Sequence, residues 1–223
     1  MFRDGIEVFC PAEIDLNFLL HEIWFDKVYN PKGYKIHPGD IVIDIGGNIG
    51  MFAIYSATRK PGIKVFSFEP FTNNAQYFSK NINNKKLSGI QLDQKAVTGK
   101  PGNRFLLVSD VWSSHALSDE KSTGKSIEVK CVTLNEILEK TGPCDLLKTD
   151  CEGSEYEIFY STTKDNLRKI HKIVGEYHNN KENNGEDLKR FLEEHSFRVD
   201  VFKMLDENSG IICATNLDYN KNR

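Results

Sequence analysis

The most constraining feature of the sequence is a glycine-rich stretch that separates a strand-like segment from a helix-like one. Residues 41–57 read IVIDIGGNIGMFAIYSA, so β-branched residues lead into three glycines and an asparagine before a helical pattern resumes. Glycines permit a tight turn and a close approach of the main chain to a ligand, and the helix start offers free N–H groups. The stretch therefore predicts a ligand cradle at the carboxyl end of a strand, and a tight turn without a ligand is the alternative.

Strand-like and helix-like segments alternate along the rest of the chain. We expect helices at 18–29, 49–58, 73–84, 134–140, 154–160 and 186–195, and strands at 41–45, 64–68, 90–95, 144–149 and 172–177. Strands at 103–109 and 127–132 interrupt the alternation, and strands at 197–204 and 210–215 close the chain. The pattern predicts an α/β, Rossmann-like fold with a seven-stranded, mostly parallel sheet and helices on both faces. It adds a C-terminal antiparallel hairpin strand and an inserted β-hairpin between the third and fourth strands.

The composition favours a single globular core. The chain has 223 residues, of which 39% are hydrophobic and 27% charged, too few for two ordinary domains. A formal net charge of -3 gives no electrostatic argument for nucleic acid. Five scattered cysteines without a CxxC pair favour a reducing compartment, and no apolar run reaches the length of a membrane span. We expect a cytoplasmic protein in which residues 1–35 form a helical segment packed on a core domain at 36–223.

The residues around the glycine loop discriminate between nucleotide ligands. A dinucleotide fingerprint needs glycine where Asn48 stands, and the lysine of a phosphate-binding loop is absent, so NAD and ATP are disfavoured. Asp44 precedes the loop, and Glu69 ends the next strand, where a carboxylate can grip both hydroxyls of a ribose. Pro70 and Phe71 follow and could frame a base. These acids predict a ligand that contains a ribose.

Three segments together resemble the FkbM family of S-adenosylmethionine-dependent methyltransferases. They are DIGGNIG at 44–50, FEP at 68–70 and KTDCEGSE at 148–155, and the last contains the D-x-E-G-x-E segment typical of that family. TLNEIL at 133–138 and VGEYH at 174–178 look like further elements of the same family, so the resemblance spans roughly residues 36–178. Gly47 stands where the family often has alanine and Cys151 where it often has valine, which are small changes.

The resemblance implies a class I methyltransferase domain whose cofactor is S-adenosyl-L-methionine and whose product is S-adenosyl-L-homocysteine. A carboxylate at Asp44 would hold the ammonium of the methionine part, directly or through water, and Glu69 would hold the ribose. The expected cofactor-binding residues are Asp44, Gly46, Gly47, Asn48, Gly50, Glu69, Pro70, Phe71, Ala96 and Asp150.

Acidic residues and a histidine follow the fourth and fifth parallel strands. Ligands of open α/β sheets bind beyond the carboxyl ends of the strands, so Asp150, Glu176 and His178 are expected at one rim. Methyl transfer is an in-line displacement in which positioning dominates, and a base contributes about 10²- to 10⁴-fold. His178 is the first candidate base, with Glu176 orienting its ring, and Asp150 is the second. A solvated histidine at the start of a loop is the alternative.

The same acids could hold a divalent metal ion. Asp150, Glu152, Glu176 and His178 offer ligands suited to Mg²⁺ or Mn²⁺. The sequence does not show that these side chains face one another, so a metal is not favoured and the predicted site contains none.

The insertion VWSSHALSDEKSTGKS at 111–126 is polar, small and aromatic, which suits recognition of a substrate beside a cofactor. A solvated hairpin tip is the alternative, and His115 is a further candidate base. The candidate substrate residues are Trp112, Ser113, Ser114, His115 and Glu152.

The resemblance thus implies a transferase that methylates a hydroxyl on a small or medium metabolite, such as a sugar, a polyketide-type product or a lipid-linked saccharide. The alternatives are a non-catalytic Rossmann-like nucleoside-binding module and, more weakly, an NAD-dependent oxidoreductase. No nucleic-acid partner and no membrane span are expected. Trp24, Phe25 and Tyr29 are expected to cover the core, although they could cap the cleft or allow a homodimer. Oxygen, nitrogen and carbon acceptors all remain open.

Overall fold

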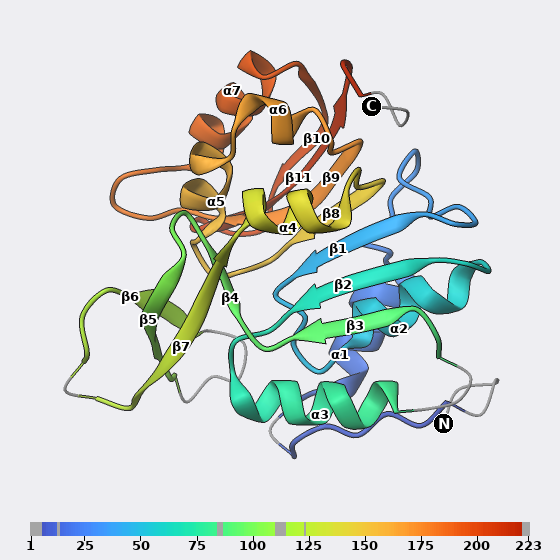
Figure 1. Ribbon diagram of the computed structural model, residues 1–223, viewed down its shortest axis with the longest axis vertical. Helices are drawn as coiled ribbons and strands as arrows, with labels where there is room; N and C mark the ends of the chain where they lie inside the picture. The colour runs from blue at the N-terminus through green and yellow to red at the C-terminus, as the bar shows by residue number, and fades with distance from the viewer. Residues whose placement is uncertain (1–5, 13, 84–86, 110–114, 123, 220–223) are drawn as a thin grey trace.

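The computed structural model describes residues 6–12, 14–83, 87–109, 115–122 and 124–219. Its main sheet has seven strands, with helices on both sides (Figure 1). The order across the sheet is β10 (Phe197–Met204), β11 (Ser209–Asn216), β9 (Lys172–His178), β8 (Leu146–Thr149), β1 (Ile41–Ile45), β2 (Lys64–Phe68) and β3 (Ile90–Asp93). The predicted α/β, Rossmann-like fold is confirmed.

The antiparallel strand of the main sheet is β11. It pairs antiparallel with both β9 and β10, whereas the pairs from β9 through β8, β1 and β2 to β3 are parallel. The C-terminal hairpin therefore inserts its second strand between β9 and β10 instead of adding both strands in chain order. Because β11 is covered on both faces, its residues are buried without the alternation of an edge strand.

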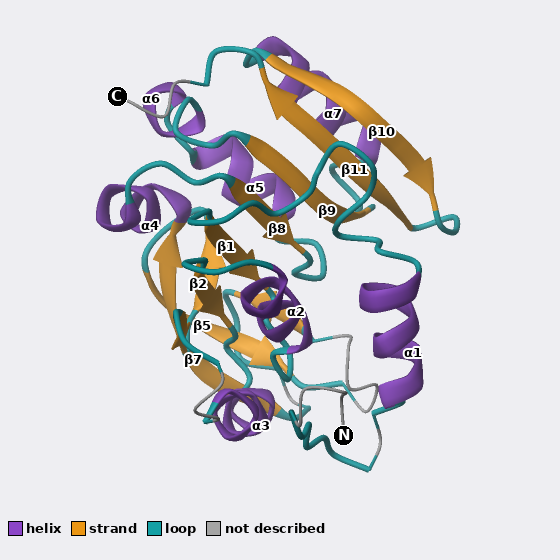
Figure 2. Ribbon diagram, turned by 90° about the vertical axis from the view of Figure 1, so that its right-hand side faces the viewer, coloured by secondary structure: helices purple, strands orange, loops and turns teal. Residues whose placement is uncertain are grey.

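Alternate residues of the central strands feed two separate cores. Ile43, Leu147 and Ile173 point to one face, where α4 (Leu134–Thr141), α5 (Glu155–Ser161), α6 (Lys164–Leu167) and α7 (Gly185–Glu194) pack. Val42 and Leu146 point to the other, which is covered by α1 (Leu16–Leu20), α2 (Met51–Arg59) and α3 (Thr72–Ile82) (Figure 2). The period of two along each strand thus builds a three-layer fold whose strand ends are left open to ligands.

The insertion between the third and fourth parallel strands is a small sheet of its own. Its order is β4 (Ala96–Thr98), β7 (Ser126–Thr133), β5 (Gly102–Leu107) and β6 (Ala116–Ser118). The sequence predicted β5 and β7 as a hairpin but not the short strands β4 and β6. These are three residues each, too short to show a period, and their formation depends on pairing with β7 and β5.

The first helix changes its geometry halfway. The α-helix α1 continues into η1 (His21–Phe25), a π-helix in which Asp26 N donates to His21 O at 2.8 Å. The wider turn lets Ile23 enter the core while Glu22 faces a cavity. A pattern of apolar residues at helical spacing predicts the helix but not this change of winding.

The aromatic residues near the N-terminus mostly cover the core, as expected. Tyr29 is buried and lies edge-on against Phe52, and Trp24 lies edge-on to Tyr55. Of the three residues that were expected to cover the core, only Phe25 is largely exposed. Within the described ranges no helix is long and apolar enough to span a membrane.

Candidate active site

A cavity of about 360 Å³ lies at the carboxyl ends of β1, β2, β8 and β9. Its walls also include residues of α1, of the inserted sheet and of the turn between β10 and β11. Acidic side chains dominate its polar lining, and the described lining residues include no lysine or arginine. The carboxylates that line it are Glu22, Glu69, Asp150, Glu152, Glu176 and Asp206.

The glycine loop forms one wall of this cavity, but its glycines have two different tasks. Gly46 has φ +79°, and a Cβ there would overlap the main-chain oxygen of Asp150, so the loop and the end of β8 can touch only without a side chain. A Cβ at Gly47 would overlap Ser67 Oγ, and Gly50 lies against the ring of Phe78. Gly46 therefore lines the cavity, whereas Gly47 and Gly50 serve the packing of the loop against the protein itself.

Glu69 anchors the other side of the loop. Its Oε2 accepts a hydrogen bond from Asn48 N at 2.8 Å, and its Oε1 accepts one from Phe71 N at 2.9 Å. Burial raises the pKa of Glu69 to about 7, even though both hydrogen bonds favour the charged form. Each oxygen keeps a lone pair, so the carboxylate can accept two more hydrogen bonds from the cavity.

Asp44 lies behind the loop and not on the cavity wall. The register of the sheet sets it beside Ser67 on β2 and Lys148 on β8. Ser67 Oγ donates to Asp44 Oδ2 at 2.6 Å, and Lys148 Nζ lies 3.4 Å from Oδ1. Asp44 thus forms a buried ion pair with Lys148. Because it does not line the cavity, the structure gives no support to a direct contact between Asp44 and a cofactor ammonium.

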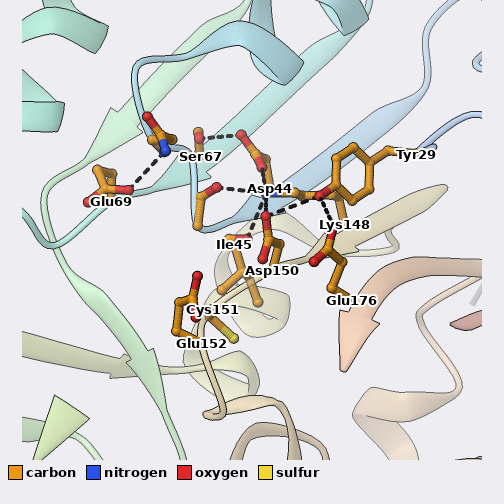
Figure 3. A network of polar contacts seen from close by, with 12 residues as sticks. Tyr29, Asp44, Ile45, Ser67, Glu69, Lys148, Asp150, Cys151, Glu152 and Glu176 are labelled. Atoms are coloured by element: carbon orange, nitrogen blue, oxygen red, sulfur yellow. Dashed lines mark hydrogen bonds and ion pairs between the residues drawn. The ribbon is translucent and has the colours of Figure 1, made fainter. Parts of the chain in front are cut away.

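Lys148 connects this buried pair to the cavity (Figure 3). Its ammonium donates to Gly46 O at 2.6 Å and to Ile45 O at 3.3 Å, and it lies 3.8 Å from Asp150 Oδ2. Burial lowers the pKa of Lys148, but the charges of Asp44 and Asp150 outweigh burial and raise it overall. A charged Lys148 therefore holds the loop after β1, through Gly46 O, close to the Asp150 carboxylate of the cavity.

Tyr29 joins the two carboxylates at the ends of β8 and β9. Its hydroxyl lies 3.1 Å from Asp150 Oδ2 and 2.9 Å from Glu176 Oε1 (Figure 3). A hydroxyl has one proton, so it can donate fully to only one of them, and a proton on Glu176 completes the other bond. Burial, followed by the charge of Asp150, raises the pKa of Glu176 to about 8. Burial and the same charge raise the pKa of Glu22, which also lines the cavity, to about 7.

His178 is held by Glu155 and not by the predicted partner Glu176. Its Nδ1 lies 3.0 Å from Oε1 of Glu155, a fully buried carboxylate that also accepts a hydrogen bond from Cys151 N at 3.1 Å. Its Nε2 lies 3.8 Å from both Glu152 Oε2 and Glu176 Oε2. This ring is therefore oriented by the protein, unlike a histidine that is simply solvated at a loop start.

The surroundings of His178 set its protonation. Burial lowers the pKa of His178, but the hydrogen bond and charge of Glu155 outweigh it, and the pKa rises to about 9. In this state the imidazole carries a proton at neutral pH. A protonated His178 cannot act as a base. A further positive charge in the cavity would lower the pKa of His178 again and so restore the predicted role near neutral pH.

The predicted metal ligands do come together in part. Asp150, Glu176 and His178 each offer one ligand atom, and these atoms lie within 4.8 Å of one another. Glu152 is the fourth predicted ligand, and its contact in this group is with His178 Nε2.

Of the substrate residues predicted in the insertion, His115 lies on the cavity wall. Its Nδ1 accepts a hydrogen bond from Ser109 N at 3.2 Å, and its ring meets the edge of Phe71 with 4.3 Å between centroids. Its Nε2 is buried and has no partner among the described residues. Pro70, Ala96 and Glu152 also line the cavity. Trp112, Ser113 and Ser114 lie outside the described residues.

Several lining or supporting residues escaped the sequence analysis. Lys148 carried a signal, because a lysine inside an apolar strand needs a buried acid as partner. Glu155, the last acid of the D-x-E-G-x-E segment, was not named among the candidate site residues. Tyr29 was named as a residue that covers the core or could cap the cleft, but its contact with Asp150 was not predicted. Other lining residues come from distant parts of the chain and had no local signal, namely Phe18, Glu22, Leu205, Asp206 and Ser209.

A sheet of this order, with a glycine loop after its first strand and an acid-lined cavity at the strand ends, is the arrangement of an α/β protein that binds a nucleotide-type ligand. The chain belongs to the FkbM methyltransferase domain family, whose profile matches residues 44–199. The resemblance predicted from the three motifs is thereby confirmed.

Two curated relatives illustrate this membership. The 31-O-demethyl-FK506 methyltransferase FkbM of Streptomyces tacrolimicus is 28% identical over 196 residues, which cover 74% of this chain and 75% of that protein. Methyltransferase 1 of Beauveria bassiana is 26% identical over 213 residues, which cover 85% of this chain and 84% of that protein.

Solved structures show the same fold. The precorrin-6y C5,15-methyltransferase of Geobacter metallireducens has a TM-score of 0.51 at 14% identity and covers 97% of both chains. A Streptococcus pneumoniae protein in complex with S-adenosyl-L-methionine has a TM-score of 0.51 at 15% identity and covers 80% of this chain and 67% of its own. At these identities the likeness establishes the fold alone.

Proposed function

We propose that this methyltransferase acts on a hydroxyl oxygen of a small or medium-sized metabolite. The observation that carries the proposal is the cavity with six Asp and Glu side chains and, among its described lining residues, no lysine or arginine. S-adenosylmethionine carries two positive charges, on its ammonium and its sulfonium, against one carboxylate, so its charge complements this lining. The phosphates of a nucleic acid would be repelled. The name of the relative from Streptomyces, which specifies an O-demethyl substrate, supports oxygen as the acceptor atom.

We propose one orientation for the cofactor in this cavity. Glu69, with one free lone pair on each oxygen, would accept the two ribose hydroxyls. Pro70 and Ala96 would flank the adenine, because both line the adjoining wall. Gly46 and Asn48 would lie along the methionine part, whose ammonium would meet Asp150. Asp44 would act only indirectly, by keeping Lys148 charged and the loop in place.

His178 and Glu155 would move the proton of the acceptor. When bound, S-adenosylmethionine supplies the electrophilic methyl group, and its positive charges lower the pKa of His178 towards neutrality. Neutral His178 would then take the hydroxyl proton at Nε2, the nitrogen that faces Glu152 and Glu176. Glu155 would accept the Nδ1–H bond and stabilise the imidazolium that forms. The cavity's carboxylates Glu152 and Glu176 would position the acceptor beside it.

The N-terminal segment takes part in this site. We extend the proposal to the division of the chain into residues 1–35 and a methyltransferase domain at 36–223, in which the first segment supplies Glu22 and Tyr29 to the cavity region.

Calorimetry with S-adenosylhomocysteine tests the proposed function. We expect the Glu69→Gln variant to bind about 10- to 100-fold more weakly than the native protein, because hydrogen bonds to a charged group contribute about 1.5–3 kcal/mol each. Glutamine keeps one carbonyl oxygen for a loop N–H, but its NH₂ group faces the other N–H, so circular dichroism is used to check that the variant is folded. Glu139→Gln on the exposed face of α4 is the matched control. Equal affinity in the two variants, or undetectable binding by the folded native protein, would overturn the proposal.

We propose that the reaction needs no metal, although three candidate ligands lie within 4.8 Å of one another. Tyr29 already bonds to Asp150 and Glu176, and a divalent ion bound to Asp150 would lie near the Lys148 ammonium, which is 3.8 Å away from that carboxylate. Transfer of a labelled methyl group should therefore be unchanged by millimolar EDTA. Loss of turnover that added Mn²⁺ restores would show instead that these residues hold a metal.

A further inference from the structure

Two large apolar side chains on the wall of the cavity are exposed to solvent. Phe18 on α1 and Leu205 after β10 both line the cavity, yet their side chains are 58% and 50% exposed. They come from segments nearly two hundred residues apart, and Figure 2 shows both segments on the same side of the molecule. Large apolar side chains left exposed at the edge of a binding cavity commonly contact a ligand.

Acidic side chains also line this cavity. Glu22, Glu152 and Asp206 line the same cavity, with no lysine or arginine among its described lining residues. Repulsion between a carboxylate and an anion is weakened little by salt inside a partly enclosed site. Some of these carboxylates would pair with the positive charges of the cofactor. The remaining ones would repel an acceptor that has a phosphate or carboxylate close to its hydroxyl.

We infer that the acceptor is an uncharged or cationic alcohol with an apolar chain, held between Phe18 and Leu205 with its hydroxyl towards His178. The inference rests on the proposed function, since it assigns the deeper part of the cavity to the cofactor. Two side chains bury far less area than the roughly 800 Å² per partner of a stable protein interface, so a small molecule suits this pair of residues better than a protein.

Three probes with the same chain and different head groups test this inference: 1-octanol, octylamine and octanoate. Each is titrated by ligand-observed NMR into protein saturated with S-adenosylhomocysteine, whose binding is established first by calorimetry. We expect 1-octanol and octylamine to bind and octanoate to bind at least about tenfold more weakly than 1-octanol.

Substitutions of Phe18 and Leu205 locate the binding. Phe18→Ser should weaken 1-octanol by roughly fivefold, since contact with one or two methylene groups is lost. Leu205→Ser should act in the same direction. Phe25→Ser is the matched control, because Phe25 is 68% exposed on the adjoining η1 and does not line the cavity.

The outcomes separate this inference from the proposed function. Failure of S-adenosylhomocysteine to bind contradicts the proposed function. Normal binding of that product, together with octanoate binding as tightly as 1-octanol, overturns the inference alone. The inference is likewise overturned if Phe18→Ser and Phe25→Ser bind 1-octanol with equal affinity, or if 1-octanol does not bind.

Discussion

Replacing His178 with glutamine is expected to lower kcat by about 10²- to 10⁴-fold, the usual contribution of a general base. Glutamine is similar in size and can still bond to Glu155, so the fold and the affinity for S-adenosylhomocysteine should be retained. Methyl transfer to an accepted alcohol, measured at saturating cofactor, gives kcat. His37→Gln, at an exposed position, is the control. A His178→Gln enzyme within a few-fold of the native rate would show that another group takes the proton.

The role of Glu155 gives this prediction a second readout. Glu155 raises the pKa of His178, so the Glu155→Gln variant should have a lower His178 pKa. A base works only when deprotonated, and the rate therefore rises with pH through the pKa of His178 in the cofactor complex. The rising limb of the pH–rate profile should move to lower pH in Glu155→Gln, with a lower plateau because the imidazolium loses its partner. An unshifted limb would assign that limb to a different group.

Replacing Lys148 with methionine is expected to lower the free energy of unfolding by about 3–5 kcal/mol, the typical effect of breaking one half of a buried ion pair. Methionine fills a similar volume, so the main loss is electrostatic. Asp44 is fully buried and, among the described residues, would keep only the Ser67 hydroxyl as a side-chain hydrogen-bond donor, while Gly46 O would lose the Lys148 ammonium. Denaturation by urea at constant pH measures the change.

A second substitution separates the charge of Asp44 from other effects at this position. Asp44→Asn in the Lys148→Met background removes the unpaired charge, and we expect the double variant to recover part of the lost stability. Lys140→Met, at an exposed position on α4, should change stability by less than about 0.5 kcal/mol. A Lys148→Met loss of under about 1 kcal/mol would contradict the view that this ion pair fixes the loop.

The sequence predicted the fold well because the fold depends on local periodicity. Ile41–Ile45 and Lys64–Phe68 were predicted with the bounds that the structure gives them. The strands β4 and β6 were missed because three residues carry no period and form only by pairing with longer strands. The π-helical turn at Glu22 was missed because apolar spacing does not distinguish the windings of a helix.

The site was predictable only as far as motifs reach. The loop at Gly46 and the acid at Glu69 stand at the expected strand ends, and Asp150, Glu176 and His178 do converge. The hydrogen bond between His178 and Glu155 was not predicted, because proximity along a strand suggested Glu176, whereas the buried start of α5 supplies Glu155 and Glu176 lies 3.8 Å from the other ring nitrogen. The link from Tyr29 to Asp150 spans 121 residues and depends on tertiary packing, which one sequence does not reveal.

The central claim is that S-adenosylmethionine binds in the acid-lined cavity against the glycine loop. A crystal structure with S-adenosylhomocysteine tests it most directly. The account predicts both ribose hydroxyls on Glu69, the adenine beside Pro70 and Ala96, and the ammonium within hydrogen-bond distance of Asp150. A nucleotide bound elsewhere on the protein, or one in this cavity whose ribose does not touch Glu69, would contradict the account.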